Sequence, residues 1–160
     1  LYKLGLRTLQ LTYMERNWVG DGCLEPENRG LTNFGMQVVR ECNRLGIVVD
    51  CSHVGIQTTL DAARISSQPI MISHTAVRAI TENPRCVTDD QMKAIADKGG
   101  TIGITTFSPF IRSDRQPTLE DYLAHFDYAI DLIGEDEARL LMLLPGRRLT
   151  IWRVILRRLA

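Results

Sequence analysis

Apolar positions along this chain follow two spacings, and the spacing of two predicts a series of short strands. Residues 4–12 carry leucine at positions 4, 6, 9 and 11, which favours a strand despite the imperfect period. Three later apolar runs, rich in β-branched residues, are typical of buried strands. The predicted strands are therefore residues 4–12, 47–51, 70–72 and 101–107.

The segments between these strands have the period of amphipathic helices. In residues 32–45 the apolar side chains fall on one face, and Gly46 follows as a C-terminal stop. Thr88-Asp-Asp-Gln91 and Thr118-Leu-Glu-Asp121 have the spacing of capping boxes, which predicts a helix after each. Helices are thus predicted for residues 32–45, 56–65, 89–98 and 119–133, and loops for 13–31 and 108–117.

Alternating strands and helices predict an α/β fold with a parallel sheet. No glycine-rich phosphate loop follows any strand, which argues against a nucleotide-binding doubly wound sheet. A whole (β/α)8 barrel needs roughly 250 residues, and this chain has 160. We therefore expect a partial (β/α)8 TIM-type barrel. The chain begins at Leu1 and enters a predicted strand almost at once, so we expect a piece that starts within a domain.

The composition changes abruptly near the C-terminal end, which divides the chain into residues 1–136 and a basic tail, 137–160. After Glu137 the tail has no acidic residue, and its arginines alternate with Leu, Ile, Trp and Val. Three interpretations stay open: a basic amphipathic helix for a membrane surface or partner, an ordinary C-terminal helix, and an out-of-frame translation. The abruptness of the change favours the third.

The overall composition indicates which classes of partner and which cellular compartment to expect. There are 19 basic and 19 acidic residues, and this balance gives no indication of nucleic-acid binding. No run of eighteen apolar residues occurs, so membrane association is not indicated. The four cysteines are widely spaced without a CxxC motif, which favours reduced thiols and a cytoplasmic location.

Two histidines are the strongest chemical signal in the sequence. His53 and His74 each follow an apolar run and a serine, with a predicted helix between the two runs. Carboxyl ends of successive parallel strands meet at one edge of a barrel, where active sites are built. Neutral imidazole is the commonest metal ligand. The pair therefore predicts a metal site, the alternative being two buried structural histidines.

Two further residues keep structural interpretations open. Asp50 lies three positions before His53, and its carboxylate is either a structural hydrogen-bond acceptor or a group that orients a metal ligand. His125 lies within the predicted helix 119–133, away from any strand end, so we expect a packing or surface histidine rather than a ligand.

Several motifs follow one another along the first 136 residues and together resemble one enzyme family. They are Leu9-Gln-Leu-Thr12, Asn17-Trp-Val-Gly-Asp-Gly22, Gly30-Leu-Thr-Asn-Phe-Gly35, Val49-Asp-Cys-Ser-His53, Ile72-Ser-His-Thr-Ala76, Asn83-Pro-Arg-Cys-Val87 and His125-Phe-Asp-Tyr-Ala-Ile-Asp-Leu-Ile-Gly-Glu-Asp136. From Gly5 to about Asp136 the chain resembles the membrane (renal) dipeptidase family of zinc dipeptidases.

The resemblance implies a metal-dependent hydrolase barrel that holds two zinc ions bridged by a glutamate and cleaves dipeptides through a metal-activated water. It implies that His53 and His74 are ligands of one zinc and that Arg85 binds the C-terminal carboxylate of the dipeptide substrate. Tyr13 stands at a substrate-contacting position that is often histidine in the family. Phe110 stands where an aromatic side chain lines the substrate pocket in relatives, and plain packing explains it equally well.

Departures from the family pattern leave a second hypothesis open. The His-x-Asp metal motif and the bridging glutamate of the family are absent, and no aspartate follows Asp136 at the expected place. At most one partial metal site is therefore expected here. The first hypothesis is a zinc-dependent dipeptidase, and the second is an inactive truncated barrel fragment with part of the metal site. A basic-tailed membrane or partner module is the third.

An open half-barrel has two unpaired strand edges, and such edges pair readily with other chains. We therefore expect the 160-residue chain to dissolve poorly or to self-associate, for example as a homo-oligomer. Light scattering on the purified chain measures this directly. A monomer that melts cooperatively would contradict the expectation.

Overall fold

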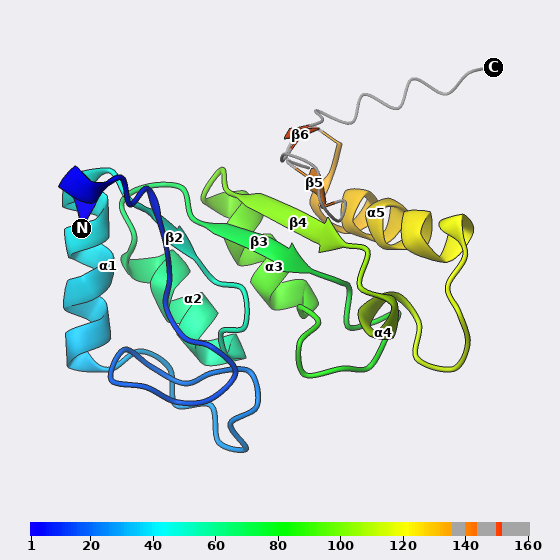
Figure 1. The fold of residues 1–160 in the computed structure, drawn as a ribbon, viewed down its shortest axis with the longest axis horizontal. Helices are drawn as coiled ribbons and strands as arrows, with labels where there is room; N and C mark the ends of the chain where they lie inside the picture. The colour runs from blue at the N-terminus through cyan, green and yellow to red at the C-terminus, as the bar shows by residue number, and fades with distance from the viewer. Residues whose placement is uncertain (136–139, 144–149, 152–160) are drawn as a thin grey trace.

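A single sheet organises the chain in the computed structural model, which describes residues 1–135, 140–143 and 150–151 (Figure 1). Within these residues the sheet order follows the chain order from β1 to β6. Strands β1 to β5 pair in parallel, and β6 is antiparallel to β5. The strands are β1 (Thr8–Gln10), β2 (Val48–Asp50), β3 (Met71–Thr75), β4 (Thr101–Thr105), β5 (Leu140–Leu143) and β6 (Thr150–Ile151).

Helices connect the parallel strands and contact one another in succession. They are α1 (Asn33–Leu45), α2 (Ile56–Ile65), α3 (Asp89–Asp97), α4 (Ser108–Ile111) and α5 (Leu119–Ile133), and a short 3₁₀ helix, η1 (Tyr2–Leu4), precedes β1. Contacts run from α1 to α2, from α2 to α3 and from α3 to α5, so these helices lie on one side of the sheet. Strands added one after another with helices on one side have the topology of a (β/α) barrel. The predicted partial barrel is confirmed.

Local signals placed the helix ends well. The Thr32 hydroxyl accepts from Gly35 N–H at the start of α1, and Gly46 ends that helix in the left-handed region with φ of 71°. Both predicted capping boxes form, from Thr88 at α3 and from Thr118 at α5. Side chains that satisfy the free N–H groups of a first turn need only short-range sequence, which explains this accuracy.

The strand boundaries and one loop require correction. The strand expected over residues 4–12 is only Thr8–Gln10, because β2 pairs with these three residues and Gly5 turns the chain with φ of 100°. The strand expected at residues 70–72 runs from Met71 to Thr75, and the one expected to reach residue 107 ends at Thr105. The expected loop 108–117 opens with the one-turn helix α4, which has proline in its first turn.

The tail beyond residue 135 is only partly described. At Leu140–Leu143 it forms β5, in register with β4 from Ile102↔Leu140 to Thr105↔Leu143. These residues form a strand, where two of the three interpretations of the tail expected a helix. Residues 136–139, 144–149 and 152–160, on which most of the predicted basic tail falls, lie outside the described residues.

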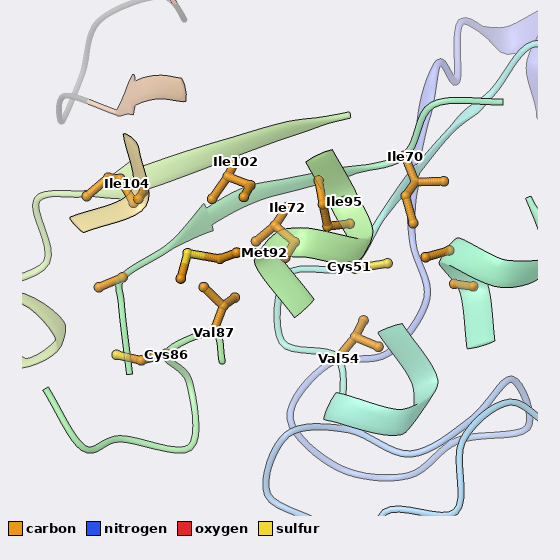
Figure 2. Packing of buried hydrophobic residues seen from close by; sticks show 14 of the residues in the cluster. Cys51, Val54, Ile70, Ile72, Cys86, Val87, Met92, Ile95, Ile102 and Ile104 are labelled. Carbon is orange, nitrogen blue, oxygen red and sulfur yellow. The ribbon is translucent and has the colours of Figure 1, made fainter. Parts of the chain in front are cut away.

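Isoleucine and methionine side chains form the core between the sheet and the helices. Ile72, Ile102 and Ile104 from the sheet are fully buried, as are Met92 and Ile95 from α3. Figure 2 shows Ile72 and Ile102 beside the two α3 side chains. Burying one such side chain contributes about 1.5–3 kcal/mol. This core therefore holds β3 and β4 firmly against α3, which makes the strand ends a rigid base for a site.

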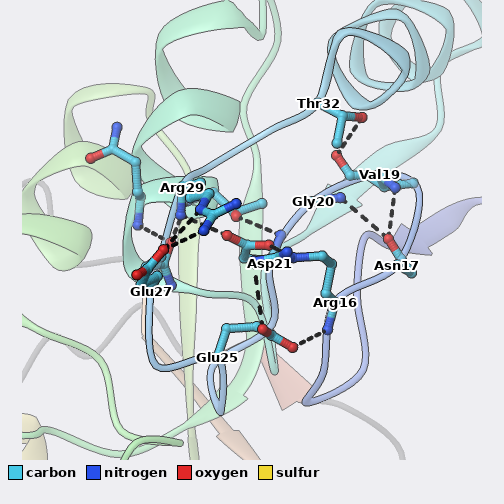
Figure 3. A network of polar contacts seen from close by, with 12 residues as sticks. Arg16, Asn17, Val19, Gly20, Asp21, Glu25, Glu27, Arg29 and Thr32 are labelled. Atoms are coloured by element: carbon cyan, nitrogen blue, oxygen red, sulfur yellow. Dashed lines mark hydrogen bonds and ion pairs between the residues drawn. The ribbon is translucent and has the colours of Figure 1, made fainter.

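The long segment 13–31 contains no helix or named strand, and a polar network orders it instead (Figure 3). Asp21 is at the centre and only 3% exposed. Its carboxylate accepts from Arg16 Nε at 2.5 Å and from Arg29 N–H at 2.6 Å, and its own N–H donates to Thr58 Oγ1 at 3.1 Å. The network ties the segment to α2, which gives the residues before and after it fixed positions.

All four cysteines are free thiols, as expected, and three of them are buried. Burial raises the pKa of Cys42, and it also raises the pKa of Cys86, to about 11. These thiols are therefore protonated near neutral pH and behave as small apolar groups within the structure.

Asp21→Asn tests the network of segment 13–31. Burial works against the charged form, but hydrogen bonds from Arg29 N–H and the Arg16 guanidinium lower the pKa of Asp21 below its usual 3.8. The carboxylate therefore stabilises the fold above the unfolded pKa, and this contribution is lost as pH falls through the folded pKa. We expect the variant to lose about 2 kcal/mol at pH 7 and less at pH 3, which is below the unfolded pKa.

Urea denaturation at the two pH values measures the difference. Asp131→Asn is the matched control, because Asp131 is an exposed aspartate of α5 and its replacement should change stability by less than about 0.5 kcal/mol. An equal loss for Asp21→Asn at both pH values would show that the carboxylate charge is not what holds the segment.

Candidate metal and substrate site

The two histidines singled out by the sequence meet at the carboxyl ends of β2 and β3. Their Nε2 atoms are 2.8 Å apart, and their rings meet edge to face with centroids 4.9 Å apart. His53 lies just beyond β2 in the left-handed region, with φ of 63°. Its carbonyl oxygen accepts from Cys23 N–H at 3.0 Å and from Thr12 Oγ1 at 3.3 Å, which holds this unfavourable conformation in place.

A β-bulge turns His74 toward His53. Ile72 pairs with Ile102 and Thr75 with Ile104, so three residue steps on β3 oppose two on β4. Without the extra residue, alternation would place the His74 side chain on the same face as Ile72, in the core. The bulge therefore moves the imidazole from the helix side of the sheet to the site.

Gly103 is what allows the bulge. It lies on β4 opposite the bulged residues, and a Cβ atom added to it would lie 2.0 Å from the carbonyl oxygen of Ser73. A real Cβ cannot approach that closely, so any side chain here would push the bulged backbone away. The orientation of His74 thus depends on a glycine of the neighbouring strand.

Both imidazoles are held in their neutral form. Burial, followed by the positive charge of Arg85, lowers the pKa of His53 to about 4, and Asp50 opposes the shift. The same causes lower the pKa of His74. A neutral imidazole has a lone pair on one ring nitrogen and can bind a metal ion near neutral pH, which an imidazolium cannot.

The histidine pair fits part of a metal site. Two Nε2 atoms converge on one point, and the buried Nδ1 of His53 has no hydrogen-bond partner among the described residues. Imidazole suits zinc and several other transition metals. Within residues 1–135 and the two short described strands, no group of three or more His, Cys, Asp or Glu side chains is arranged to hold a metal ion. The pair thus has donor atoms for two metal ligands, fewer than a metal ion requires.

Tyr13 stacks on His53. The ring centroids are 4.4 Å apart and the planes 24° from parallel. The ring remains 70% exposed, so one face packs on the imidazole and the other faces solvent. Met14 follows in the left-handed region with φ of 67°, and its carbonyl oxygen accepts from Leu24 N–H at 2.9 Å. The ordered segment 13–31 therefore brings Tyr13 to the place where a ligand of the histidine pair would lie.

Arg85 is a buried cation beside the same histidines. It is 5% exposed, and its Nη2 donates to the carbonyl oxygen of His74 at 3.2 Å. Its guanidinium carbon lies 5.2 Å from the centre of the Phe110 ring, on α4. Among the described residues, the Nε of Arg85 has no hydrogen-bond partner. The same residues contain no carboxylate that forms an ion pair with Arg85. Burial lowers the pKa of this guanidinium, and a carboxylate would compensate its charge.

A cavity of about 370 Å³ adjoins Arg85. Arg78 and three cysteines, Cys23, Cys51 and Cys86, also line it, so two guanidinium groups and three thiols border one space. No sequence pattern pointed to Arg78 or Cys23 as site residues. Arg78 lies four residues after His74, and its position at the same cavity as Arg85 depends on the parallel bridge between Val77 and Val87, which no local pattern indicates.

The structure brings together all four residues that the sequence predicted for the site. Tyr13 contacts His53, His53 contacts His74, and Arg85 bonds to the backbone of His74. Their roles as ligands and substrate contacts remain predictions. His125 lies elsewhere and is fully buried: its Nδ1 accepts from Val77 N–H at 2.9 Å and its Nε2 donates to Ile111 O at 3.1 Å. It is the packing histidine that the sequence suggested.

No described helix is long and apolar enough to cross a membrane.

A barrel segment with paired neutral imidazoles and a buried arginine at one rim has features that fit the class of metal-dependent hydrolases, and comparison with known proteins gives the family. The family model described as "Membrane dipeptidase (Peptidase family M19)" matches residues 1–140. The chain therefore belongs to the membrane dipeptidase family, a family of metallopeptidases, as its motifs predicted.

Individual relatives agree with this assignment. The chain is 35% identical to dipeptidase verJ from Clonostachys rogersoniana over 84% of its own length and 35% of that relative. An amidohydrolase from Pseudomonas aeruginosa superposes with a TM-score of 0.81 at 36% identity, covering 91% of this chain and 45% of that one.

A second solved structure adds a bound ligand. A metallopeptidase from Rhodobacter sphaeroides, solved with a phosphinate mimic of the dipeptide L-Ala-D-Ala, superposes with a TM-score of 0.79 at 32% identity. The match covers 92% of this chain and 45% of that one. Across these three relatives, the chain spans between about a third and a half of their length.

Replacing Arg85 with methionine should stabilise the fold. The variant loses one hydrogen bond and the Phe110 contact, but it removes a buried charge that no described ion pair compensates. Apolar replacement of even a paired buried charge is often stabilising by about 1–4 kcal/mol, and because Arg85 has no described ion pair, we expect a gain of about 1–2 kcal/mol in the free energy of unfolding.

Urea denaturation measures the gain, with Arg40→Met on the exposed face of α1 as the control that should change little. Acetate, a probe for the substrate carboxylate, should stabilise the wild-type chain more than Arg85→Met. A variant clearly less stable than wild type would mean that the guanidinium is compensated within the protein.

Proposed function

We propose that the protein to which this chain belongs is a zinc-dependent dipeptidase that hydrolyses the peptide bond of dipeptides. The observation that carries the proposal is the convergence of two neutral imidazoles beside a buried arginine at one rim of a barrel. Membership of a family of metallopeptidases supports it, as does the dipeptide mimic bound to the Rhodobacter sphaeroides relative.

In this proposal each group has a distinct task. His53 and His74 would hold the metal through their Nε2 atoms, and zinc bound there supplies Lewis-acid activation of water and of the peptide carbonyl. Arg85 binds the C-terminal carboxylate of the dipeptide in a bidentate manner and so sets the position of the scissile bond. Tyr13 covers the open side of His53 and limits the access of solvent.

A second candidate is that this chain by itself is an inactive part of such an enzyme. It rests on the absence, within the described residues, of a third metal-binding side chain near the histidine pair. Zinc in proteins almost always has four ligands, and catalytic sites keep three from the protein. On this alternative the chain binds one metal ion weakly and does not turn over dipeptides.

Zinc content and dipeptide hydrolysis of the purified chain test the proposal. We expect one zinc per chain, and His53→Ala or His74→Ala should each weaken zinc binding by at least about 100-fold, because each removes a ligand. Cys23→Ser is the control, since it replaces a thiol beside the site, whose backbone N–H bonds to the His53 carbonyl, without changing either imidazole; it should leave zinc binding unchanged.

Three outcomes separate the hypotheses. Zinc bound through the histidines together with turnover supports the dipeptidase, and the Arg85→Met variant should then raise KM far more than it lowers kcat. Zinc without turnover supports the inactive part. No zinc binding, or binding that survives both histidine substitutions, overturns the assignment of His53 and His74.

A further inference from the structure

A buried carboxylate lies behind His74 and contacts it through a serine. Asp50, the last residue of β2, is 5% exposed. Its Oδ1 accepts from Ser52 N–H at 2.9 Å and from Ser73 N–H at 3.0 Å, and its Oδ2 contacts Ser73 Oγ at 2.5 Å. Ser73 Oγ in turn lies 2.8 Å from His74 Nδ1. The β-bulge is what allows neighbouring residues of one strand to meet in this way.

The protons of this network have one consistent arrangement. A carboxylate only accepts hydrogen bonds, so the single hydroxyl proton of Ser73 is directed to Asp50. Ser73 Oγ then has only lone pairs left for His74, and Nδ1 of His74 must donate to it. In the opposite arrangement Ser73 would donate to His74, and its oxygen would face the Asp50 oxygen at 2.5 Å with no proton between them.

Ser52 completes the arrangement. Its Oγ accepts from the backbone N–H of His74 at 3.0 Å and lies 2.9 Å from Ser73 Oγ. Its own proton therefore points to Ser73, which now donates once and accepts twice. Each hydrogen-bonding group of the network has a partner, and a buried network satisfied in this way is rigid.

We propose that Asp50, acting through Ser73, holds His74 in the tautomer protonated at Nδ1, so that the lone pair of Nε2 faces the site before any metal arrives. Asp50 and Ser73 are positioning residues, because neither reaches the point where the two Nε2 atoms converge. The consequence for metal binding rests on the proposed function, whereas the tautomer itself does not.

His53 lacks such support and takes the opposite tautomer in the metal-free chain. Its Nδ1 has no hydrogen-bond partner among the described residues, and its Nε2 lies 2.8 Å from Nε2 of His74. Because the latter nitrogen presents a lone pair, Nε2–H of His53 donates to it. Metal binding would thus require His53, but not His74, to move its proton to the other ring nitrogen.

Long-range proton–nitrogen NMR spectra of the ¹⁵N-labelled chain, kept metal-free with a chelator, test the proposal because they distinguish the two tautomers of each histidine. We expect the Nδ1–H form for His74 and the Nε2–H form for His53. His125 is an internal standard: its backbone partners fix the Nε2–H form independently of the site, so its unchanged signals report that a variant is folded.

Variants of the relay give opposite and specific changes. In Ser73→Ala, His74 loses its Nδ1 acceptor and becomes a mixture of tautomers. Ser73→Thr restores the hydroxyl and the Nδ1–H form. In Asp50→Asn the amide oxygen still accepts from the two backbone N–H groups, so the amide NH₂ faces Ser73 and donates to its Oγ. The Ser73 hydroxyl then donates its proton to Nδ1 of His74. His74 therefore changes to the Nε2–H form. Ser113→Ala, an exposed serine, is the matched control.

Zinc titration of the same variants gives the second readout. Ser73→Ala should weaken zinc binding by about 10- to 100-fold, as loss of a group that orients a ligand does, and Ser73→Thr should recover most of it. An Nε2–H form of His74 in the wild-type chain, or signals of His74 that Ser73→Ala leaves unchanged, would overturn the proposal. The expected tautomers without any zinc binding would instead contradict the proposed function and leave the relay intact.

Discussion

The β-bulge in β3 is the constraint on which the rest of the site depends. Ser73 and His74 occupy the extra residue step, and Gly103 on β4 leaves the space that their backbone requires. Ile72 remains in the core, so the strand is anchored while the residues after it face the site. Had regular alternation continued past Ile72, His74 would lie among apolar side chains and could not meet His53.

Three supports on different elements keep the site polar at the edge of an apolar core. The carboxylate of Asp50 accepts from the backbone N–H of Ser73 in the bulge and from that of Ser52 just after β2, which ties the two strand ends together. The network around Asp21 orders the segment that carries Tyr13 and Cys23. Burial, and after it the charge of Arg85, keeps both histidines neutral, and no described ion pair compensates that charge. The polar character of the site thus comes from buried charged groups, whose burial costs free energy unless hydrogen bonds compensate it.

Much of the fold was open to prediction, and the reason is local chemistry. The spans of α2 and α5 were predicted to the residue, and α1 and α3 lie within a residue or so of prediction. In α1, α3 and α5 a threonine cap marks the first turn over a few residues. Strand lengths were predicted less accurately, since pairing with a neighbouring strand decides where a strand ends. β1 is three residues long because only Thr8–Gln10 pair with β2. The one-turn helix α4 was missed because its few residues show no period.

The sequence by itself determined the fold class, the family and the residues of the candidate site, because strand-end histidines and motif spacing are properties of the chain order. It did not show how His53 and His74 come to face one another. Tertiary structure decided this, through the left-handed backbone of His53 and the bulge opposite Gly103. The relay from Asp50 to His74 likewise depends on the pairing of β2 with β3, which brings together Ser52 and Ser73, 21 residues apart in the sequence. Such contacts arise from register and backbone irregularity, which no local pattern of residue types specifies.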